Sequence, residues 1–439
     1  MPRSLASLSL ASALVVYGSS AFAQAEPLPL TLREAVRRAA EDPPAVRTAI
    51  ARADAARAQI EQARAGYYPT ISTSASASIG FSDQPVLANL RYQSTTVGLS
   101  ANVTARVPIY DFGRTSNAVD ASTRGSRASR EDLRTARVQA MSAVASAYLT
   151  VLSDQEAINA ARATVAQREA HLRIAEGLVT AGARPPIERT RAEVDLDVGR
   201  LDLTSAEARE RNDRATLAAA LGIDPLREVT LAAVEDESLS ADDDPARASA
   251  AAVEHRPEFA AARARLQQAE AQASQSRAGR LPVLAAQASA GVNYTERLQG
   301  QGAFGISEQL QGAVTLSWAA FDPTVNANVR IADANVTTAR ETLAQQSLQV
   351  RAAAVQAAIN LRASRLLLDQ SERLATSAAA NLAQATGRYE AGAAPLLELV
   401  DAQAADASAR YAVVRARVAF QIARVSVLTA TGEIDRLAR

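Results

Sequence analysis

Apolar and polar residues alternate along four stretches of the chain: 70–81, 96–107, 283–294 and 310–321. In the first stretch Ile71, Ile79 and Phe81 share one set of positions, and the other set is serine, threonine or glycine. A period of two is typical of a β-strand with one apolar and one polar face. We therefore predict a strand in each stretch, close to the ~9–11 residues that a tilted strand needs to cross a bilayer.

These strands could belong either to a soluble, half-buried sheet or to the wall of a membrane β-barrel. In a soluble, half-buried sheet the packed face would carry mostly large aliphatic and aromatic residues, whereas alanine is frequent here. Small apolar groups toward lipid and serine, threonine or glutamine toward water suit a membrane β-barrel wall better. The segments 82–95 and 295–309 are polar or glycine-rich, and we expect long loops there. The pattern favours the barrel wall.

Long helices are predicted after each pair of strands, because the chain has no proline between Pro108 and Pro185 or between Pro323 and Pro395. We expect a long helix at 113–180, a return helix at 187–222, and their counterparts at 324–390 and 396–432. Large apolar residues recur every seven positions, as in supercoiled helices. They are Val144, Val151, Ile158, Val165, Leu172 and Val179 in the long helix, and Ile187, Val194 and Leu201 in the return helix.

The chain contains a tandem duplication. Pro44 aligns with Pro257 at an offset of 213, and Gly182 aligns with Gly392 at an offset of 210. Each copy predicts the same order of helix, two strands, long helix, turn and return helix. The expected segments are a signal peptide at 1–23, a first repeat at 24–222, a linker at 223–256, a second repeat at 257–432 and a tail at 433–439.

The N-terminus has the features of a secretory signal peptide. Arg3 precedes an apolar run from Leu5 to Tyr17, and Ala21-Phe22-Ala23 is a small-residue cleavage pattern, with cleavage expected after Ala23. A membrane anchor is the alternative, but the run is shorter than the ~20 residues of a spanning helix. We expect an exported protein.

Composition excludes several chemistries. The 47 basic residues, all arginine, balance 47 acidic residues, so the chain has no net positive charge that would favour binding to nucleic acid. Without lysine or cysteine there is no P-loop, Schiff base, disulfide or thiolate metal site. His171 and His255 lack partners at ligand spacing and are expected to be ordinary exposed histidines. The acidic cluster 235–244 lacks a calcium-loop pattern and is expected to be a solvated linker. We expect no enzyme, cofactor or metal.

Several motifs, taken together, resemble the TolC-type outer-membrane efflux proteins. They are Gly-Tyr-Tyr-Pro at 66–69, Val-Pro-Ile-Tyr-Asp-Phe-Gly at 107–113 and the segment Tyr-Glu-Ala-Gly-Ala-Ala-Pro beginning at Tyr389. The resemblance implies a mostly α fold with a transmembrane β-barrel, with four strands and long helical hairpins per chain. It further implies a homotrimer with a 12-stranded barrel continuous with a periplasmic α-barrel. Without cysteine after the signal peptide, the chain resembles the unlipidated branch.

The same resemblance implies partners and a gate. The partners are outer-membrane lipid, a periplasmic adaptor and an inner-membrane transporter, for drug efflux or type I secretion. Glu398 and Asp401, at spacing i, i+3, would form an acidic ring past the tip turn, although two solvated surface acids explain the spacing equally well. Tyr389 and Glu188 would make a hydrogen bond at the tip. In the family a basic residue can hold the tip closed at the position that Ala394 occupies here. Gly182 and Gly392 would form the tip turns.

One other function stays open at this point, a periplasmic coiled-coil adaptor or scaffold without membrane insertion. Such proteins also contain long helical hairpins, but they lack paired alternating strands beside each hairpin. The prediction is therefore an outer-membrane channel that conducts passively, with the drug, metal ion or polypeptide cargo left undetermined.

Overall fold

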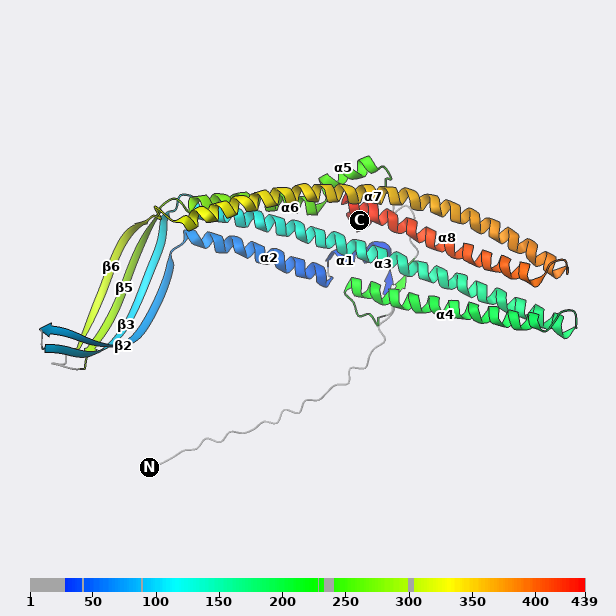
Figure 1. Ribbon diagram of the computed structural model, residues 1–439, viewed down its shortest axis with the longest axis horizontal. Helices are drawn as coiled ribbons and strands as arrows, with labels where there is room; N and C mark the ends of the chain where they lie inside the picture. Colours follow the sequence, from blue (N-terminus) through cyan, green and yellow to red (C-terminus); the bar gives the residue numbers. More distant parts are fainter. Residues whose placement is uncertain are drawn as a thin grey trace, which may run out of the picture.

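The computed structural model describes residues 28–41, 43–87, 90–227, 229–232, 241–298 and 304–438. The predicted signal peptide, with its cleavage residue Ala23, lies outside the described residues. The molecule is elongated, with a sheet at one end and helices along the remainder (Figure 1). In chain order the elements are β1 (Leu28–Leu30), α1 (Leu32–Glu41), α2 (Pro44–Arg64), η1 (Ala65–Tyr67), β2 (Thr70–Leu87), β3 (Leu90–Tyr110), α3 (Arg114–Thr180), α4 (Ile187–Leu221), β4 (Val229–Leu231), α5 (Pro245–His255), α6 (Pro257–Ala278), β5 (Val283–Arg297), β6 (Phe304–Ser317), α7 (Pro323–Glu390), α8 (Leu396–Thr431) and η3 (Ile434–Ala438).

The sheet at one end of the molecule is antiparallel, in the order β2-β3-β5-β6. Its register places Leu99 opposite Tyr294, and Tyr294 opposite Ile306. Since residues paired across strands share a face, the apolar positions of all four strands lie on one side. Two carboxylates are exceptions on that side: Glu296, opposite Val97, and Glu308, opposite Val292.

The strands differ in extent from the expectation. Most of 82–95 was expected to be a loop, but β2 continues to Leu87 and β3 begins at Leu90. Backbone pairing does not need apolar side chains, and the hydroxyls of Ser82 and Ser94 lie 2.9 Å apart across the extended hairpin. The expected end at 321 is wrong for β6, which stops at Ser317. Just after this end the Trp318 indole donates a hydrogen bond to the Arg280 carbonyl, 3.0 Å away.

In each repeat an aspartate lies just before the long helix and accepts hydrogen bonds from backbone amides at its N-terminus. Asp111 accepts hydrogen bonds from the amides of Gly113 and Thr115, and Asp322 accepts one from the Thr324 amide at 2.8 Å. These bonds satisfy amides that have no partner within the helix. Helices α3 and α7 have 67 and 68 residues, so each is about 100 Å long at 1.5 Å per residue. None of the described helices contains a stretch both long and apolar enough to pass through a membrane.

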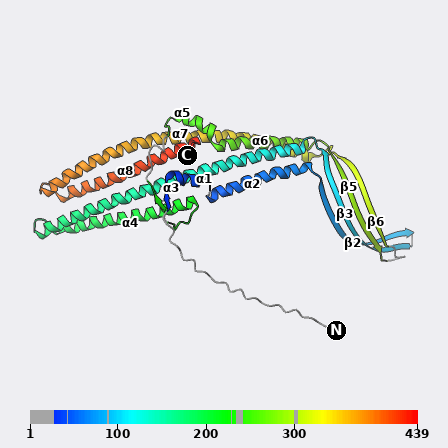
Figure 2. The same ribbon diagram turned by 180° about the vertical axis from the view of Figure 1, so that it is seen from behind.

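The shorter helices lie end to end in pairs beside the long ones (Figure 2). Helix α4 ends at Gly222, where a Cβ atom would lie 2.9 Å from Pro44 Cδ at the start of α2. Helix α8 ends at Gly432, against the backbone of His255 just before α6. Both glycines have positive φ, 72° and 78°, and so permit this close approach.

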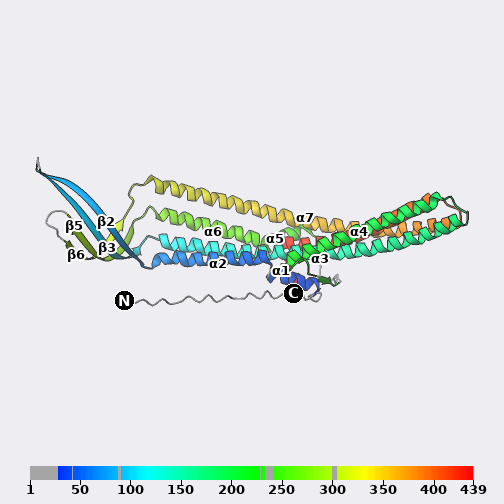
Figure 3. The same cartoon turned by 90° about the horizontal axis from the view of Figure 1, so that it is seen from below.

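The region between the repeats, expected to be a linker at 223–256, contains β4 and α5. Strand β4 pairs in parallel with β1, and the Tyr148 hydroxyl lies 2.9 Å from the Leu30 carbonyl and 2.6 Å from that of Ala232. Burial of this hydroxyl raises the pKa of Tyr148 to about 12. The C-terminal segment joins the same core through Ile434 and Leu437. This core lies halfway along the helices (Figure 3).

The seven-residue spacing has different outcomes in the two helices. Val144, Val151 and Ile158 of α3 are buried. In α4, Ile187, Val194 and Leu201 are instead exposed, by 54%, 57% and 70%. Within one chain these residues do not form a seam, because α4 buries a line of small residues at the same spacing. They are Ala192, Gly199 and Ala206.

Candidate functional site at the helical tip

The two helical hairpins turn at the end of the molecule that is farthest from the sheet (Figure 1). At the first turn the Ala183 amide donates to the Leu178 carbonyl at 3.0 Å, and at the second the Ala393 amide donates to the Arg388 carbonyl at 2.8 Å. Gly182 and Gly392 each have φ of 70°, with no other atom within 4 Å of the place where a Cβ would lie. The two turns therefore have the same backbone conformation, in which a glycine in the left-handed region follows the end of the helix.

A buried hydrogen bond joins the hairpins just behind these turns. The Tyr389 hydroxyl of α7 donates to Glu188 Oε2 of α4 at 3.1 Å. Tyr389 is 3% exposed and Glu188 is 9% exposed. Burial and the neighbouring carboxylate of Glu188 both raise the pKa of Tyr389. The structure thus brings together the two residues that were predicted to form the tip hydrogen bond.

Arg184 completes this contact, although the sequence analysis did not single it out. Its guanidinium lies 5.3 Å from the Tyr389 ring centroid, and its Nη1 lies 3.7 Å from Glu188 Oε1. Ala394, the expected site of a basic lock residue, is a buried alanine. Arg184 is its counterpart in the first repeat at the offset of 210, so the repeat alignment was the signal that could have identified it.

His171 of α3 lies behind the same tyrosine, and the expectation that it is exposed is wrong. It is 6% exposed, and its ring centroid lies 5.9 Å from that of Tyr389. Its Nε2 atom has no hydrogen-bond partner within the part of the chain that the structure describes. Burial lowers the pKa of His171, and the carboxylates of Asp195 and Glu188 oppose this shift only in part.

The two predicted gate acids have different surroundings. Glu398 Oε1 lies 2.5 Å from Arg388 Nη1, in an ion pair that spans the second turn. Asp401 is exposed on the following turn of α8. Within one chain, therefore, Arg388 balances the charge of Glu398. Arg388 was not singled out from the sequence, where it precedes the tip glycine by four positions.

The acidic cluster between the repeats lies partly outside the described residues. Of its described members, Asp242 and Asp244 both pair with Arg247, and Asp244 caps α5 by accepting from the Ala246 amide. Among the residues that the structure describes, no three histidine, aspartate or glutamate side chains are placed to hold a metal ion.

Comparisons with known proteins fit this architecture. A family model described as outer membrane efflux protein matches residues 35–223 and 248–433. The outer-membrane channel OprN has a similar structure, with a TM-score of 0.76 and 24% identity over 91% of this chain and 89% of that one. The CmeC outer membrane channel of Campylobacter jejuni has a TM-score of 0.77 and 19% identity, over 92% and 85%. The outer membrane protein VceC of Vibrio cholerae has a TM-score of 0.74 and 18% identity, over 91% and 96%. A comparison with curated proteins finds no match.

Proposed function

Because the chain belongs to the outer membrane efflux protein family, we propose that it forms the outer-membrane channel of a tripartite efflux pump or a type I secretion system. In this role it conducts its cargo passively to the exterior. The energy comes from an inner-membrane transporter that a periplasmic adaptor connects to the channel. Drugs, metal ions and polypeptides are all compatible with such a conduit.

The observation that carries the proposal is the uncovered apolar face of the sheet. Leu310 is 88% exposed and Ile79 is 80% exposed, and both lie on this face. The opposite face is polar and carries small side chains, with the Ser76 and Ser100 hydroxyls 2.7 Å apart. A face of exposed aliphatic residues is unfavourable in water and favourable in lipid, so the apolar side meets the bilayer and the polar side lines a water-filled channel.

Closure of the wall requires further copies of the chain. In the described part of the chain, β2 and β6 each have one edge without a partner strand. Four strands are fewer than the ~8 of the smallest membrane barrels, and an open edge in lipid leaves backbone groups unpaired. We infer that β6 of one copy pairs with β2 of the next, and that three copies form the 12-stranded barrel. The helices then form the periplasmic tunnel below it.

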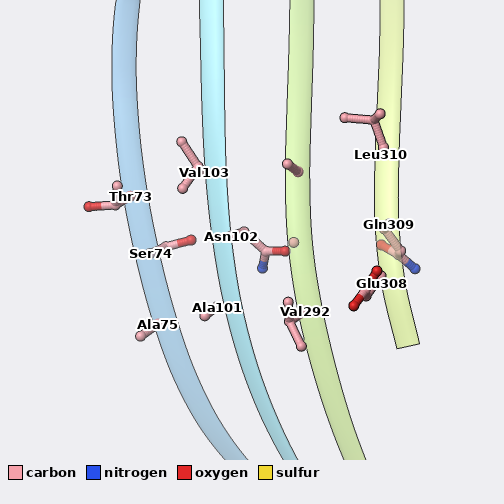
Figure 4. A pocket seen from close by; sticks show the side chains of 12 residues that line it. Thr73, Ser74, Ala75, Ala101, Asn102, Val103, Val292, Glu308, Gln309 and Leu310 are labelled. Carbon is pink, nitrogen blue, oxygen red and sulfur yellow. The ribbon is translucent and has the colours of Figure 1, made fainter. Parts of the chain in front are cut away.

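Many side chains in the middle of the four-stranded sheet are small. A hollow crosses all four strands there, and Ala75, Ala101 and Asn102 are among the residues that line it (Figure 4). The Asn102 side chain lies across Gly291 of the neighbouring strand, and a Cβ at Gly291 would come within 2.0 Å of its Oδ1 atom. The Ser76, Ser100 and Asn102 side chains thus give the middle of the polar face uncharged hydrogen-bonding groups, which suits passive conduction.

The tip is the proposed place for both the gate and the adaptor contact. In the closed state the contact between Tyr389 and Glu188 would hold the two hairpins together. Asp401, with Glu398 beside it, would give the opening a preference for cations. Ile187 and Leu397 are repeat counterparts in the first turns of α4 and α8, exposed by 54% and 63%. They are apolar points on which an adaptor can dock.

Membrane fractionation of a matched pair of variants tests the proposal. Leu310→Arg places a charge on the apolar face, and Gln309→Arg places the same charge on the polar face one residue away. An arginine facing the centre of a bilayer costs about 2–4 kcal/mol per copy. We expect the protein and its Gln309→Arg variant to fractionate with the outer membrane and to form trimers in detergent, and Leu310→Arg to do neither.

The opposite result supports the alternative function. A mature protein that stays monomeric and dissolved without detergent, unaffected by either variant, would indicate the periplasmic adaptor or scaffold. Planar bilayers supply a second measurement, since the purified trimer should form conducting pores.

A further inference from the structure

His171 is enclosed at the tip by groups from three elements. Helix α7 supplies the Tyr389 ring, at a centroid distance of 5.9 Å. Helix α4 supplies the carboxylates of Glu188 and Asp195, which both act on the imidazole. The turn before α4 supplies Arg184, whose guanidinium lies over the same tyrosine.

Two of the charged groups near His171, Glu188 and Arg168, have partners of their own. Glu188 accepts from Tyr389 and lies near Arg184. Arg168, one turn earlier on α3, donates to the backbone carbonyl of Asp195 at 2.7 Å. The neutral imidazole therefore fills this space as an aromatic ring against Tyr389. A protonated imidazole would be a buried cation whose Nε2 atom has no hydrogen-bond partner among the described residues.

Resting on the channel function proposed above, we propose that His171 is a positioning residue for Tyr389, and that its protonation releases the hydrogen bond between Tyr389 and Glu188. The imidazolium would compete with the tyrosine hydroxyl for the Glu188 carboxylate, and its need for water would favour an arrangement in which the ring is exposed. Acid would thereby separate the two hairpins and open the tip.

The direction follows from proton linkage. In the closed tip the pKa of His171 lies below the ordinary value of 6.5, whereas an exposed ring in an open tip would have the ordinary value. The open form therefore binds the proton more tightly. The closed tip has its full stability above the ordinary pKa and loses stability as the pH falls below it. One proton per chain changes the ratio of open to closed tips by at most about tenfold per pH unit.

A distance measurement at the tip tests this proposal without relying on conduction. The chain has no cysteine, so Ala181→Cys and Ala391→Cys give one spin label on each hairpin turn. We expect the distance between the labels to lengthen or broaden between pH 8 and pH 5 in the otherwise unchanged trimer. His171→Gln should abolish this response. His255→Gln, which removes the exposed histidine, should leave it intact.

A titration of the unsubstituted side chains covers the case in which His171→Gln fails to fold. The chain contains two histidines, so labelled imidazoles give two signals in magnetic resonance, and the loss of one in His255→Gln assigns both. We expect the pKa of His171 to lie below its ordinary value of 6.5. An unchanged label distance from pH 8 to pH 5, a response that persists in His171→Gln, or a His171 that titrates at the ordinary value would each overturn the proposal.

Bilayer recordings separate this inference from the proposed function. Pores that conduct but ignore pH would leave the channel function standing and reject the role of His171. A protein that forms no pores at any pH, while its labels still separate in acid, would reject the channel and retain the acid-sensitive tip.

Discussion

Glu188 and Tyr389 lie 201 positions apart in the sequence and meet in a 3.1 Å hydrogen bond at the tip. The bond joins the return helix of the first repeat to the long helix of the second repeat. It is therefore a contact between the two hairpins, and its loss should affect their separation more than the stability of either hairpin.

Removing either partner should loosen the tip. Tyr389→Phe and Glu188→Gln each disturb a buried hydrogen bond, and a bond of this kind contributes about 1 kcal/mol, or roughly a fivefold change in the open population. The open probability in planar bilayers measures the effect. Because both variants disturb one interaction, the double variant should fall short of the sum of the two.

A tyrosine outside the tip is the matched control. Tyr67→Phe alters an exposed hydroxyl near the sheet and should leave the open probability unchanged. Strict additivity of the two tip variants would show that the bond does not hold the hairpins together.

The two gate acids should contribute unequally to ion selectivity. Arg388 balances Glu398 within the chain, whereas Asp401 is exposed on the next turn. We expect Asp401→Asn to reduce the preference for cations more than Glu398→Gln does, and Arg388→Ala to increase it. Reversal potentials in a salt gradient measure all three. The same selectivity in the double variant Glu398→Gln, Asp401→Asn would remove the gate assignment without affecting the fold.

Glycines with similar backbone angles should differ in their tolerance of a methyl group. Gly182→Ala strains the backbone, at about 1–2 kcal/mol, because φ is 70° there and the space around it is open. Gly222→Ala adds a clash with Pro44 Cδ at 2.9 Å and should destabilise by about 1–3 kcal/mol more. Thermal unfolding in detergent measures the difference.

A helical glycine supplies the control for these substitutions. Gly177 lies within α3 with open space around it, so Gly177→Ala should stabilise by about 1 kcal/mol. Equal losses of stability in Gly182→Ala and Gly222→Ala would show that the junction of α4 with α2 accommodates the added methyl group at little cost.

A carboxyl pair near the middle of the molecule should make stability depend on pH. Burial, together with the neighbouring Asp213, raises the pKa of Asp154 to about 7 from its ordinary 3.8. The folded chain therefore holds a proton that the unfolded chain releases, and stability should fall as the pH rises from about 4 to about 7. Asp154→Asn should remove this slope, so the variant should melt higher than the unsubstituted protein at pH 8.

An exposed aspartate provides the comparison for that melting series. Asp369→Asn on α7 should retain the slope of the unsubstituted protein. A slope that persists in Asp154→Asn would place its origin in other groups.

The sequence predicted the strands well where apolar and polar residues alternate with the two-residue repeat of a β-strand. Alternation marked all four strands, because a strand directs successive side chains to opposite faces. It missed the continuation of β2 and β3 through polar residues, since backbone pairing there needs no apolar partner. It also extended β6 past Ser317, beyond which the Trp318 indole bonds to the Arg280 carbonyl and not to a neighbouring strand.

The tip was only partly accessible to sequence reasoning. Tyr389 and Glu188 were found through a family resemblance, because no local pattern connects residues so far apart. Arg184 and His171 were missed, since their roles depend on which helices pack together. The return helix shows the same limit. A spacing of seven identified a face of α4, but the neighbouring α3 selected Ala192 and Gly199 for burial in place of Val194 and Leu201.

The parallel pairing of β1 with β4 has a consequence for biosynthesis. Residues 28–30 are made early, yet their partners at 229–231 appear only when half of the chain is complete. Ile434 and Leu437, which pack into the same core, are made later still. A contact between such distant segments requires the closure of a long loop, which slows folding. The core in the middle of the molecule therefore cannot form completely until residues 434–437 have been made, and a shorter chain lacks part of it.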